Sequence, residues 1–501
     1  MRRLSVFIEI NGESVYVGEI AGKDSTDACF TYADAYVENP EHHAISIGLP
    51  LEEKKFDAAC TRIFFEGLLP EGFTRRCVAE WMHIDENDYV SILAGLGREC
   101  LGAIKIVDES DEVIHPEYRE LSAEEVYALA SEGATESAEL VTKSHLSLTG
   151  ASGKVGLYYE EKEEKWYLPI GEAPSTHIVK QSHVRLKKIV TNEQLCLLTA
   201  KNLGIDIPES FIITTDGDDE TVLFATKRYD RKFMEDDRML NGMPVPRRLH
   251  QEDFAQALGI AAASKYEKNN EGYLKRLFDV IRANSADPMT DSLKLWDICV
   301  FNYLIGNTDN HIKNLSLLYG EDLKTVRLAP AYDIVSTMIY QSSTENMALS
   351  IDGICNINEI TRLSFEKTAL QIGIGPKIAM KRFDTMVKGI EKFKEYFADF
   401  SDNYVIIGGT ACDIHEELNA QTPRATKDMD IVLIIEALST EFVAKFWEFI
   451  VNGQYGDKNR GEGIESHQEY YRFKRPLNPD YPYQIELFAR NVGLINFPDE
   501  A

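Results

Sequence analysis

Alternation of apolar and polar residues predicts a hairpin at the start of the chain. Leu4–Ile10 and Val15–Ile20 are apolar runs on either side of an Asn-Gly dipeptide, the strongest short-range signal of a tight β-hairpin. Residues 58–82 then carry apolar side chains at helical spacing, interrupted by a turn that contains Pro and Gly, and predict two helices. These elements indicate a small α+β domain over residues 1–107.

The pattern changes twice over the middle of the chain. Residues 108–140 are acidic and contain one helical segment near 122–131, and we interpret them as a solvated connector. Short strand-like runs separated by turns follow over residues 141–250, with one helix among them. Residues 251–400 are mostly helical in spacing, and their last predicted helix spans about 383–400.

A third pattern begins after residue 403, where YVIIGG predicts a buried strand. We expect a small mixed αβ domain over residues 401–501. A length of 501 residues allows about three domains. The predicted fold class of the whole chain is α+β.

Composition restricts the classes of function. A formal net charge of −29 argues against a broad nucleic-acid surface, because phosphates require Lys and Arg side chains, and it suits a basic partner. The eight cysteines form no C-x-x-C pair, so neither a zinc site nor a disulfide framework is indicated. No segment approaches the ~18 apolar residues of a membrane span, and the first ten residues predict a strand rather than a signal peptide. We expect a cytoplasmic protein.

Five polar residues occur in the order that phosphoryl transfer requires. Asp309 and Asn314 are separated by four residues, as in the kinase catalytic loop, where Asp accepts the substrate hydroxyl proton and Asn binds Mg²⁺. Asp333 follows two apolar strands, where a kinase needs an acid that bridges the metal to the phosphates. Upstream, Lys180 ends a strand and Glu193 opens a helix, the pairing that aims a lysine at nucleotide phosphates.

Each of these features also has an ordinary structural explanation. Asp309 and Asn314 would suit a polar turn, and Asp333 an Asx-turn. Lys180 and Glu193 would form a surface ion pair worth about 0–1 kcal/mol. Their order along the chain is what favours a kinase-like small lobe followed by a helical lobe.

The glycine-containing turn SLTGASGK at 147–154 is not a P-loop. A Walker A loop requires G-x4-G-K-[ST]. Here Gly150 and Gly153 are too close together, and Val155 follows Lys154. The P-loop class of NTPases is therefore excluded.

Longer segments around these residues resemble the HipA family of serine/threonine kinases, the toxins of bacterial toxin–antitoxin pairs. The resemblance covers roughly residues 1–398 in family order and implies a HipA-like two-lobed kinase fold with an N-terminal α+β accessory domain. The segments that carry it are FFEGLLPEG (64–72), LGRECLGAIKI (96–106), LSLTGASGK (146–154), PSTHIVK (174–180), NEQLCLLTAKNLGI (192–205), KRYDR (227–231), RLHQEDF (248–254), IGNTDNHIKN (305–314) and LAPAYDIVS (328–336).

The resemblance implies a role for individual residues. It makes Asp309 the catalytic base and Asn314 and Asp333 the Mg²⁺ ligands. It makes Ser147 the loop serine that such kinases autophosphorylate, with Ser144, Thr149 and Ser152 as nearby alternatives. It makes Lys180 the phosphate-binding lysine and Lys227 and Tyr229 the nucleotide hinge. The full ATP-binding set that it implies is Lys180, Glu193, Lys227, Tyr229, Lys154, Gly150, Gly153, His311 and Lys313.

The same resemblance implies ATP and Mg²⁺ as cofactors and a protein substrate, for example an aminoacyl-tRNA synthetase. It implies a small helix-turn-helix antitoxin as partner, through which the chain would meet DNA only indirectly. Two other classes remain open: a small-molecule phosphotransferase, and a catalytically silent scaffold that binds the antitoxin. Retention of Asp309, Asn314 and Asp333 together argues against the scaffold.

The C-terminal segment resembles nucleotidyltransferases, notably the abortive-infection and minimal groups. Gly408 and Gly409 follow a strand and open a helix whose N–H groups can bind a triphosphate. Asp428 and Asp430 alternate along a strand, so both carboxylates face one side and can share Mg²⁺. Glu486 fits a third carboxylate on a neighbouring strand. A turn and a polar strand entry are the ordinary alternative, and a pure binding module also remains open.

Overall fold

A computed structural model describes most of the chain as far as residue 387 and parts of the remainder. For the strands after residue 403 the description covers the backbone. The described residues are 2–108, 114–132, 153–181, 186, 188–214, 222–235, 238–268, 271–387, 404–406, 428–433, 445, 448–449, 451–461, 469–477 and 484–489.

The chain divides into two compact units, each built from separate stretches of sequence. The first comprises Met1–Gln194, Pro208–Ser292 and His311–Tyr332. The second comprises Leu195–Ile207, Leu293–Asn310 and Asp333–Ala501. Within the described residues, no helix is both long and apolar enough to cross a membrane.

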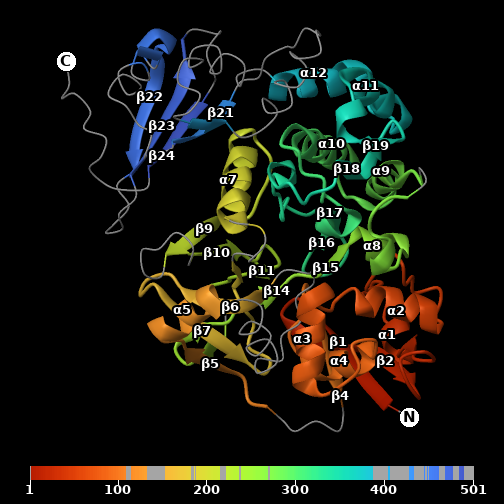
Figure 1. Ribbon diagram of the computed structural model, residues 1–501. Helices are drawn as coiled ribbons and strands as arrows, with labels where there is room; N and C mark the ends of the chain where they lie inside the picture. Colours follow the sequence, from red (N-terminus) through yellow and green to blue (C-terminus); the bar gives the residue numbers. More distant parts are fainter. Residues whose placement is uncertain are drawn as a thin grey trace. The chain divides into compact units, whose positions relative to one another are not determined.

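The first unit begins with a four-stranded antiparallel sheet in the order β3-β2-β1-β4 (Figure 1). Asn11 and Gly12 adopt φ angles of 52° and 82°, as a tight hairpin turn requires, so the predicted hairpin is confirmed. The predicted helix–turn–helix is α2 and α3, which lie beside the sheet with α4. The elements are β1 (Arg2–Ile10), β2 (Glu13–Gly22), β3 (Cys29–Tyr32), α1 (Asp34–Val37), α2 (Ala58–Glu66), α3 (Gly72–Met82), α4 (Tyr89–Leu96) and β4 (Ile104–Asp108).

A six-stranded sheet in the order β5-β7-β6-β8-β10-β9 follows in the same unit. It carries the predicted strand–strand–helix–strand layout, with α7 between β8 and β9. Its elements are β5 (Glu117–Glu120), α5 (Ala123–Glu132), β6 (Lys154–Glu160), β7 (Lys165–Ile170), β8 (His177–Gln181), α7 (Ile189–Asn202), β9 (Ser210–Thr214) and β10 (Val222–Lys227).

The structure differs from the connector predicted over residues 108–140. Part of that stretch is the edge strand β5, which pairs with β7. The reason is Tyr118, which is buried, donates its hydroxyl to the Pro174 carbonyl at 2.9 Å and packs on Tyr158 with ring centroids 4.3 Å apart. One buried aromatic residue thus draws an otherwise acidic segment into the sheet, and α5 confirms the predicted helix within it.

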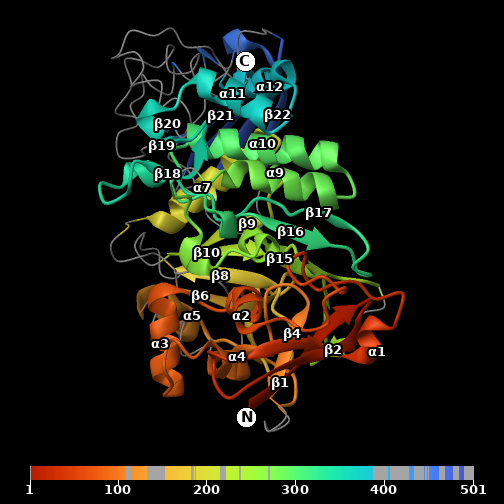
Figure 2. The same cartoon turned by 90° about the vertical axis from the view of Figure 1, so that its right-hand side faces the viewer.

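A smaller sheet in the order β15-β16-β17 also belongs to the first unit (Figure 2), together with the two-stranded sheets β11-β14 and β12-β13. The loop that contains the predicted Asn314 runs directly into β16. The remaining elements of this region are β11 (Arg231–Lys232), β12 (Met239–Leu240), β13 (Met243–Pro244), β14 (Arg247–Arg248), β15 (Gln251–Asp253), α8 (Phe254–Leu258), η1 (Ala262–Ser264), α9 (Tyr273–Asn284), η2 (Ile312–Asn314), β16 (Ser316–Tyr319) and β17 (Val326–Leu328).

Helices form the core of the second unit. Phe365 contacts Tyr303 and Phe383 with ring centroids 5.0 and 4.9 Å apart, and the Trp296 indole donates to the Ala379 carbonyl at 3.1 Å. The predicted last helix starts earlier than expected, and its residues beyond 387 lie outside the described ones. The elements are α10 (Pro288–Leu304), which begins in the first unit, η3 (Thr337–Ile339), β18 (Asn346–Ile351), β19 (Ile354–Asn356), η4 (Ile357–Glu359), α11 (Arg362–Gln371) and α12 (Pro376–Val387).

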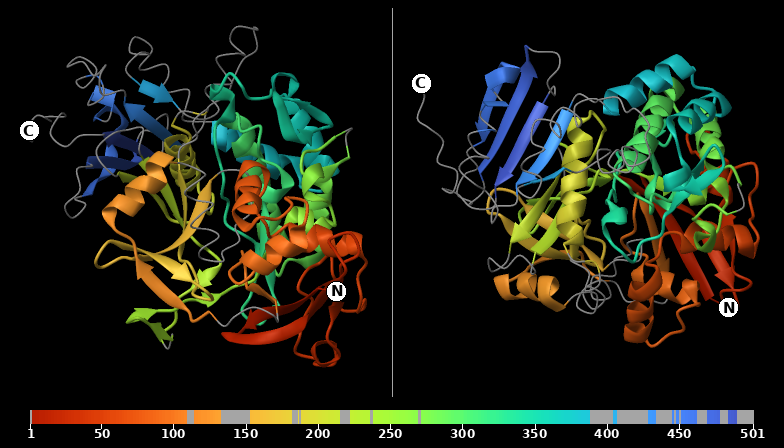
Figure 3. Two further views of the ribbon diagram at one scale, coloured as in Figure 1. Left: turned by 60° about the horizontal axis from the view of Figure 1, so that its bottom comes forward. Right: turned by 45° about the horizontal axis from the view of Figure 1, so that its top comes forward.

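A five-stranded sheet in the order β20-β21-β24-β23-β22 also belongs to the second unit. Its blue strands lie side by side in the right panel of Figure 3. β21 and β24 are parallel, and the other neighbours are antiparallel. The strands are β20 (Tyr404–Ile406), β21 (Asp428–Leu433), β22 (Tyr455–Gly461), β23 (Glu469–Pro476) and β24 (Gln484–Ala489).

Candidate active site

Lys180 and Glu193 form a buried ion pair in the first unit. Lys180 Nζ donates to Glu193 Oε1 at 2.7 Å, and the two side chains are only 9% and 5% exposed. The ammonium group also lies 5.6 Å from the ring centroid of Phe224 on β10. The alternative of a surface ion pair is therefore wrong. Lys154 on β6 stands opposite Lys180 in the β6–β8 register, so two lysines of the predicted ATP-binding set occupy neighbouring positions in the sheet.

Asp309 sits in a turn that is held by two asparagines. Asn307 Oδ1 accepts from the Asp309 backbone N–H at 3.1 Å, and Asn307 Nδ2 donates to Asn302 Oδ1 at 2.6 Å. Asn302 Nδ2 also donates to the Ile298 carbonyl of α10 at 2.8 Å, which fixes the Asn302 side chain. Asp309 is exposed, while every other residue of the fully described stretch 301–317 is buried. A rigid turn that presents one accessible carboxylate suits a general base.

Thr337 joins the Asp309 turn to the segment that follows Asp333, within the second unit. Its Oγ1 accepts from the Thr308 N–H at 2.8 Å and donates to the Gly306 carbonyl at 3.0 Å. Asp333 lies four residues before Thr337 and has a φ of 58°. Non-glycine residues in this left-handed region cluster at functional sites. The two predicted acids therefore lie on segments that are bonded to each other.

Asn314 lies in the first unit, at the end of the single turn η2. Its N–H donates to the His311 carbonyl at 2.8 Å. Lys313 is buried, and its Nζ donates to Asp253 Oδ2 at 2.7 Å. Burial opposes the charge of Lys313, but Asp253 and Glu71 outweigh it and raise its pKa. The His311 ring packs edge-on against a tyrosine of the same unit, and the ATP-binding roles of His311 and Lys313 stay predictions.

The predicted hinge residues lie at the end of β10, which Lys227 closes, and just after it. Lys227 Nζ lies 3.0 Å from Glu161 Oε1 and 3.4 Å from Glu209 Oε2. The Tyr229 hydroxyl donates to Gln251 Oε1, and its ring lies 5.9 Å from that of Tyr332. Tyr229 is thereby fixed between elements of the first unit, whereas Lys227 is engaged at the surface by acidic side chains.

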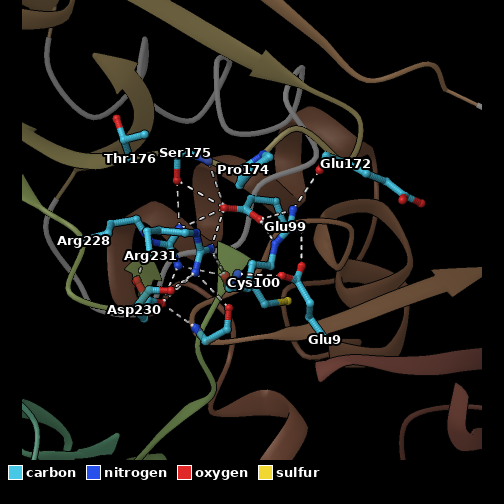
Figure 4. Close-up of polar contacts among 12 residues, drawn as sticks. Glu9, Glu99, Cys100, Glu172, Pro174, Ser175, Thr176, Arg228, Asp230 and Arg231 are labelled. Carbon is cyan, nitrogen blue, oxygen red and sulfur yellow. Dashed lines mark hydrogen bonds and ion pairs between the residues drawn. The ribbon is translucent and has the colours of Figure 1, made fainter. Parts of the chain in front are cut away.

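A buried charge network surrounds the hinge segment (Figure 4). Glu99 Oε1 lies 3.0 Å from Arg228 Nη1 and 2.8 Å from Arg231 Nη2. Glu99 Oε2 lies 2.8 Å from Arg248 Nη2, and Asp230 Oδ2 lies 2.7 Å from Arg228 Nη2. Burial opposes the ionisation of Glu99, but the three guanidinium groups outweigh it and lower its pKa to about 2. The network ties the segment before β4 to the segment that carries Tyr229.

Several functional candidates were missed by the sequence reasoning. The residues of the charge network lie in segments that carry the family resemblance, but the sequence analysis gave these residues no role. The feature that could have indicated them is a charged residue beside apolar ones, as in LGREC. Asn302, Asn307 and Thr337 gave no such signal, because their importance comes from hydrogen bonds to backbone groups distant in sequence.

Some predicted residues lie outside the described ones, namely Ser147, Gly150, Gly408 and Gly409. Gly153 is described and directly precedes β6.

The predicted C-terminal carboxylates fall on neighbouring strands. Asp428 and Asp430 lie on β21, and Glu486 lies on β24 as the register partner of Asp430. The backbone therefore brings Asp430 and Glu486 to adjacent positions of one parallel strand pair.

The donor chemistry of the predicted kinase residues fits Mg²⁺. Asn314 and Asp333 offer an amide and a carboxylate oxygen, the ligand type that this ion prefers. Among the described residues, no group of three or more His, Cys, Asp or Glu side chains could hold a metal ion. Mg²⁺ is commonly held by one or two carboxylates together with substrate phosphates, so a magnesium site does not require three such side chains.

Known proteins match this chain over most of its length. "Putative kinase Y4mE" of Sinorhizobium fredii is 30% identical over 397 residues, which are 78% of this chain and 91% of that protein. The serine/threonine-protein kinase toxin HipA of Shewanella oneidensis is 25% identical over 382 residues, 74% of this chain and 83% of that protein. The structure of that organism's HipA in complex with HipB and operator DNA has a TM-score of 0.62 at 21% identity, and the match covers 76% of this chain and 87% of that one.

Two family profiles account for the same part of the chain. The HipA N-terminal domain matches residues 8–107, and the HipA-like C-terminal domain matches residues 146–393. The five-stranded C-terminal sheet lies outside both matches. A buried lysine–glutamate pair, two linked acidic turns and these matches lead to one conclusion: the chain belongs to the HipA kinase family.

Proposed function

We propose that the chain is an ATP-dependent serine/threonine protein kinase and the toxin of a type II toxin–antitoxin pair. The observation that carries the proposal is the buried Lys180–Glu193 ion pair at 2.7 Å. Desolvating two charges is costly, so a buried pair of this kind favours a functional role, and aiming a lysine at nucleotide phosphates is such a role. The linked turns of Asp309 and Asp333 add the acids that phosphoryl transfer requires.

Each residue would have one task in the reaction. Asp309 accepts the proton of a serine or threonine hydroxyl as the hydroxyl oxygen attacks the γ-phosphorus and ADP departs. Lys180, oriented by Glu193, binds the phosphates of ATP. Asn314 and Asp333 hold Mg²⁺, which neutralises phosphate charge when bound.

Autophosphorylation is part of this proposal, with Ser147 as the acceptor. A phosphate there would add a charge of about −1.5 to −2 beside the nucleotide-binding residues. It would act as an internal brake on the kinase.

The partners are proposed from the relatives. HipA of Shewanella oneidensis was crystallised with HipB and operator DNA, and we propose an equivalent small helix-turn-helix antitoxin here. The net charge of −29 suits a chain that leaves DNA contacts to its partner. A protein of translation, such as an aminoacyl-tRNA synthetase, is the proposed substrate.

A second activity, nucleotidyl transfer, is proposed for the C-terminal sheet. The observation that favours it is the register pairing of Asp430 with Glu486 on parallel strands. Asp428 lies two positions before Asp430 on β21, so the three acidic residues occupy neighbouring positions of one parallel strand pair. Such a set suits Mg²⁺ and a nucleoside triphosphate.

One experiment separates these activities. Purified full-length protein is incubated with Mg²⁺ and either γ-labelled or α-labelled ATP, and labelled residues are mapped by mass spectrometry. The proposal expects γ-label on a serine, with Ser147 as the first candidate, and loss of that label in Asp309→Asn. Label from α-labelled ATP that disappears in Asp428→Asn would support nucleotidyl transfer. Release of inorganic phosphate without any labelled protein would argue against a protein kinase.

A further inference from the structure

Three oxygen acceptors engage Lys313, two through hydrogen bonds and one through an ion pair. Its Nζ donates to Asp253 Oδ2 at 2.7 Å and to the Gly67 carbonyl at 3.3 Å, and it lies 3.5 Å from Glu71 Oε1. The side chain is 4% exposed. Two hydrogen bonds and one ion pair therefore engage the ammonium group inside the protein. Lys313 is thus built into the protein rather than displayed to a ligand.

Two of these acceptors come from the N-terminal domain. Gly67 and Glu71 belong to the turn between α2 and α3, more than 240 residues before Lys313 in the sequence. Asp253 caps α8 in a capping box with Gln256, and Gln256 Nε2 donates to the Phe64 carbonyl of α2 at 2.8 Å. Helix α2 and the α2–α3 turn are therefore each held against the elements that surround Lys313.

The contacts of Lys313 also fix its neighbour Asn314. The Tyr332 hydroxyl donates to the Lys313 carbonyl at 3.0 Å, and the Asn314 N–H closes the same turn on His311. With side chain and backbone both anchored, the turn has little freedom to move Asn314. A residue that holds Lys313 therefore acts on Asn314 without touching it.

We propose that the N-terminal domain is an internal positioning element for the catalytic loop, in which Glu71 holds Lys313 and thereby sets the position of Asn314. Glu71 is a positioning residue. The functional consequence rests on the proposed kinase activity, because Asn314 matters as a metal ligand only there. Lys313 then serves the loop instead of binding ATP directly.

Charge balance explains why Glu71 matters. Lys313 and Lys265 face Asp253 and Glu71, with Lys265 Nζ 2.7 Å from Glu71 Oε2. The four charges cancel. Replacing Glu71 by glutamine leaves one buried positive charge without compensation, and the turn around Lys313 must relax to bring in water.

Hydrogen exchange of the nucleotide-free full-length protein tests the proposal directly. Glu71→Gln is compared with Glu66→Gln, a matched control five residues earlier. Glu66 is similarly exposed and is paired with Arg62 and Arg75 of its own domain. We expect amide exchange in the peptide spanning 307–318 to rise about tenfold or more in Glu71→Gln, as loss of an ion pair with a buried lysine implies, and to stay at the wild-type rate in Glu66→Gln. Equal exchange in the two variants would overturn the proposal.

A kinetic measurement then links the loop to the metal. In Glu71→Gln the Mg²⁺ concentration for half-maximal phosphoryl transfer should rise, while Glu66→Gln keeps the wild-type value. If Glu71→Gln does not fold, Glu71→Asp against Glu66→Asp gives the same comparison with the charge retained. If the wild-type protein transfers no phosphate while exchange still rises in Glu71→Gln, the kinase proposal is refuted and the positioning role stands. Normal transfer with unchanged exchange would refute the positioning role alone.

Discussion

Replacing Glu99 by glutamine is expected to destabilise the protein by about 3–5 kcal/mol, the cost of breaking a buried ion pair from one side. Glu99 is 1% exposed and makes ion pairs with Arg228, Arg231 and Arg248. It also accepts from the N–H and the hydroxyl of Ser175, both at 3.2 Å. Glutamine keeps the shape but directs an NH2 group at one of the arginines.

The charges of this network show why the loss is large. Three arginines face three acids, because Asp230 pairs with Arg228 and Arg231 and Glu9 pairs with Arg248. The network is neutral with Glu99 and carries an excess charge of +1 without it. Water cannot readily screen that charge, since the side chains of Arg228 and Arg231 are 0% and 1% exposed.

Denaturant unfolding at pH 7 measures the effect. Glu172→Gln is the control, because the Glu172 side chain is 39% exposed where it pairs with Lys105 at 3.0 Å, and its replacement should cost less than about 1 kcal/mol. A lowered pKa means that the Glu99 contribution is complete above its unfolded pKa of about 4.5 and is lost as pH falls toward 2. A loss below about 1 kcal/mol in Glu99→Gln would refute the reasoning.

Three further predictions concern other residues. Glu252 is buried, and this desolvation raises its pKa to about 7; wild-type stability should fall as pH rises from about 5 to 8, and Glu252→Gln should remove that part of the dependence in unfolding titrations. Thr337→Val removes the acceptor of the Thr308 N–H, so kcat should fall about tenfold or more while the ATP Kd stays unchanged. Lys180→Met should weaken ATP binding about tenfold or more by calorimetry, since a charged hydrogen bond to phosphate is lost.

Sequence patterns predicted the helices and strands that depend on residues close to one another along the chain. The Asn-Gly hairpin and the helices of residues 58–82 follow from turn chemistry and apolar spacing, and both are present. The edge strand β5 was missed, because burial of Tyr118 against Tyr158 depends on residues 40 positions away. The acidic residues of β5 are exposed. They do not indicate that the tyrosine between them is buried.

The candidate site divides in the same way. Spacing along the chain selected Asp309, Asn314 and Asp333, because kinase chemistry fixes the order of its parts. The supports around them, such as Asn307 and Thr337, act through hydrogen bonds to backbone groups. A sequence gives no sign of which backbone group a side chain will meet, so these residues emerged only from the structure.

Single-turnover phosphoryl transfer in Asp309→Asn tests the central claim most directly. Asparagine preserves the turn, since the Asn307 contact reaches the Asp309 backbone N–H and not its side chain. The rate of γ-phosphoryl transfer should fall about 10²- to 10⁴-fold, the usual contribution of a general base, with ATP affinity unchanged in the same preparation. Transfer at the wild-type rate with ATP bound would contradict the assignment of Asp309 as the catalytic base.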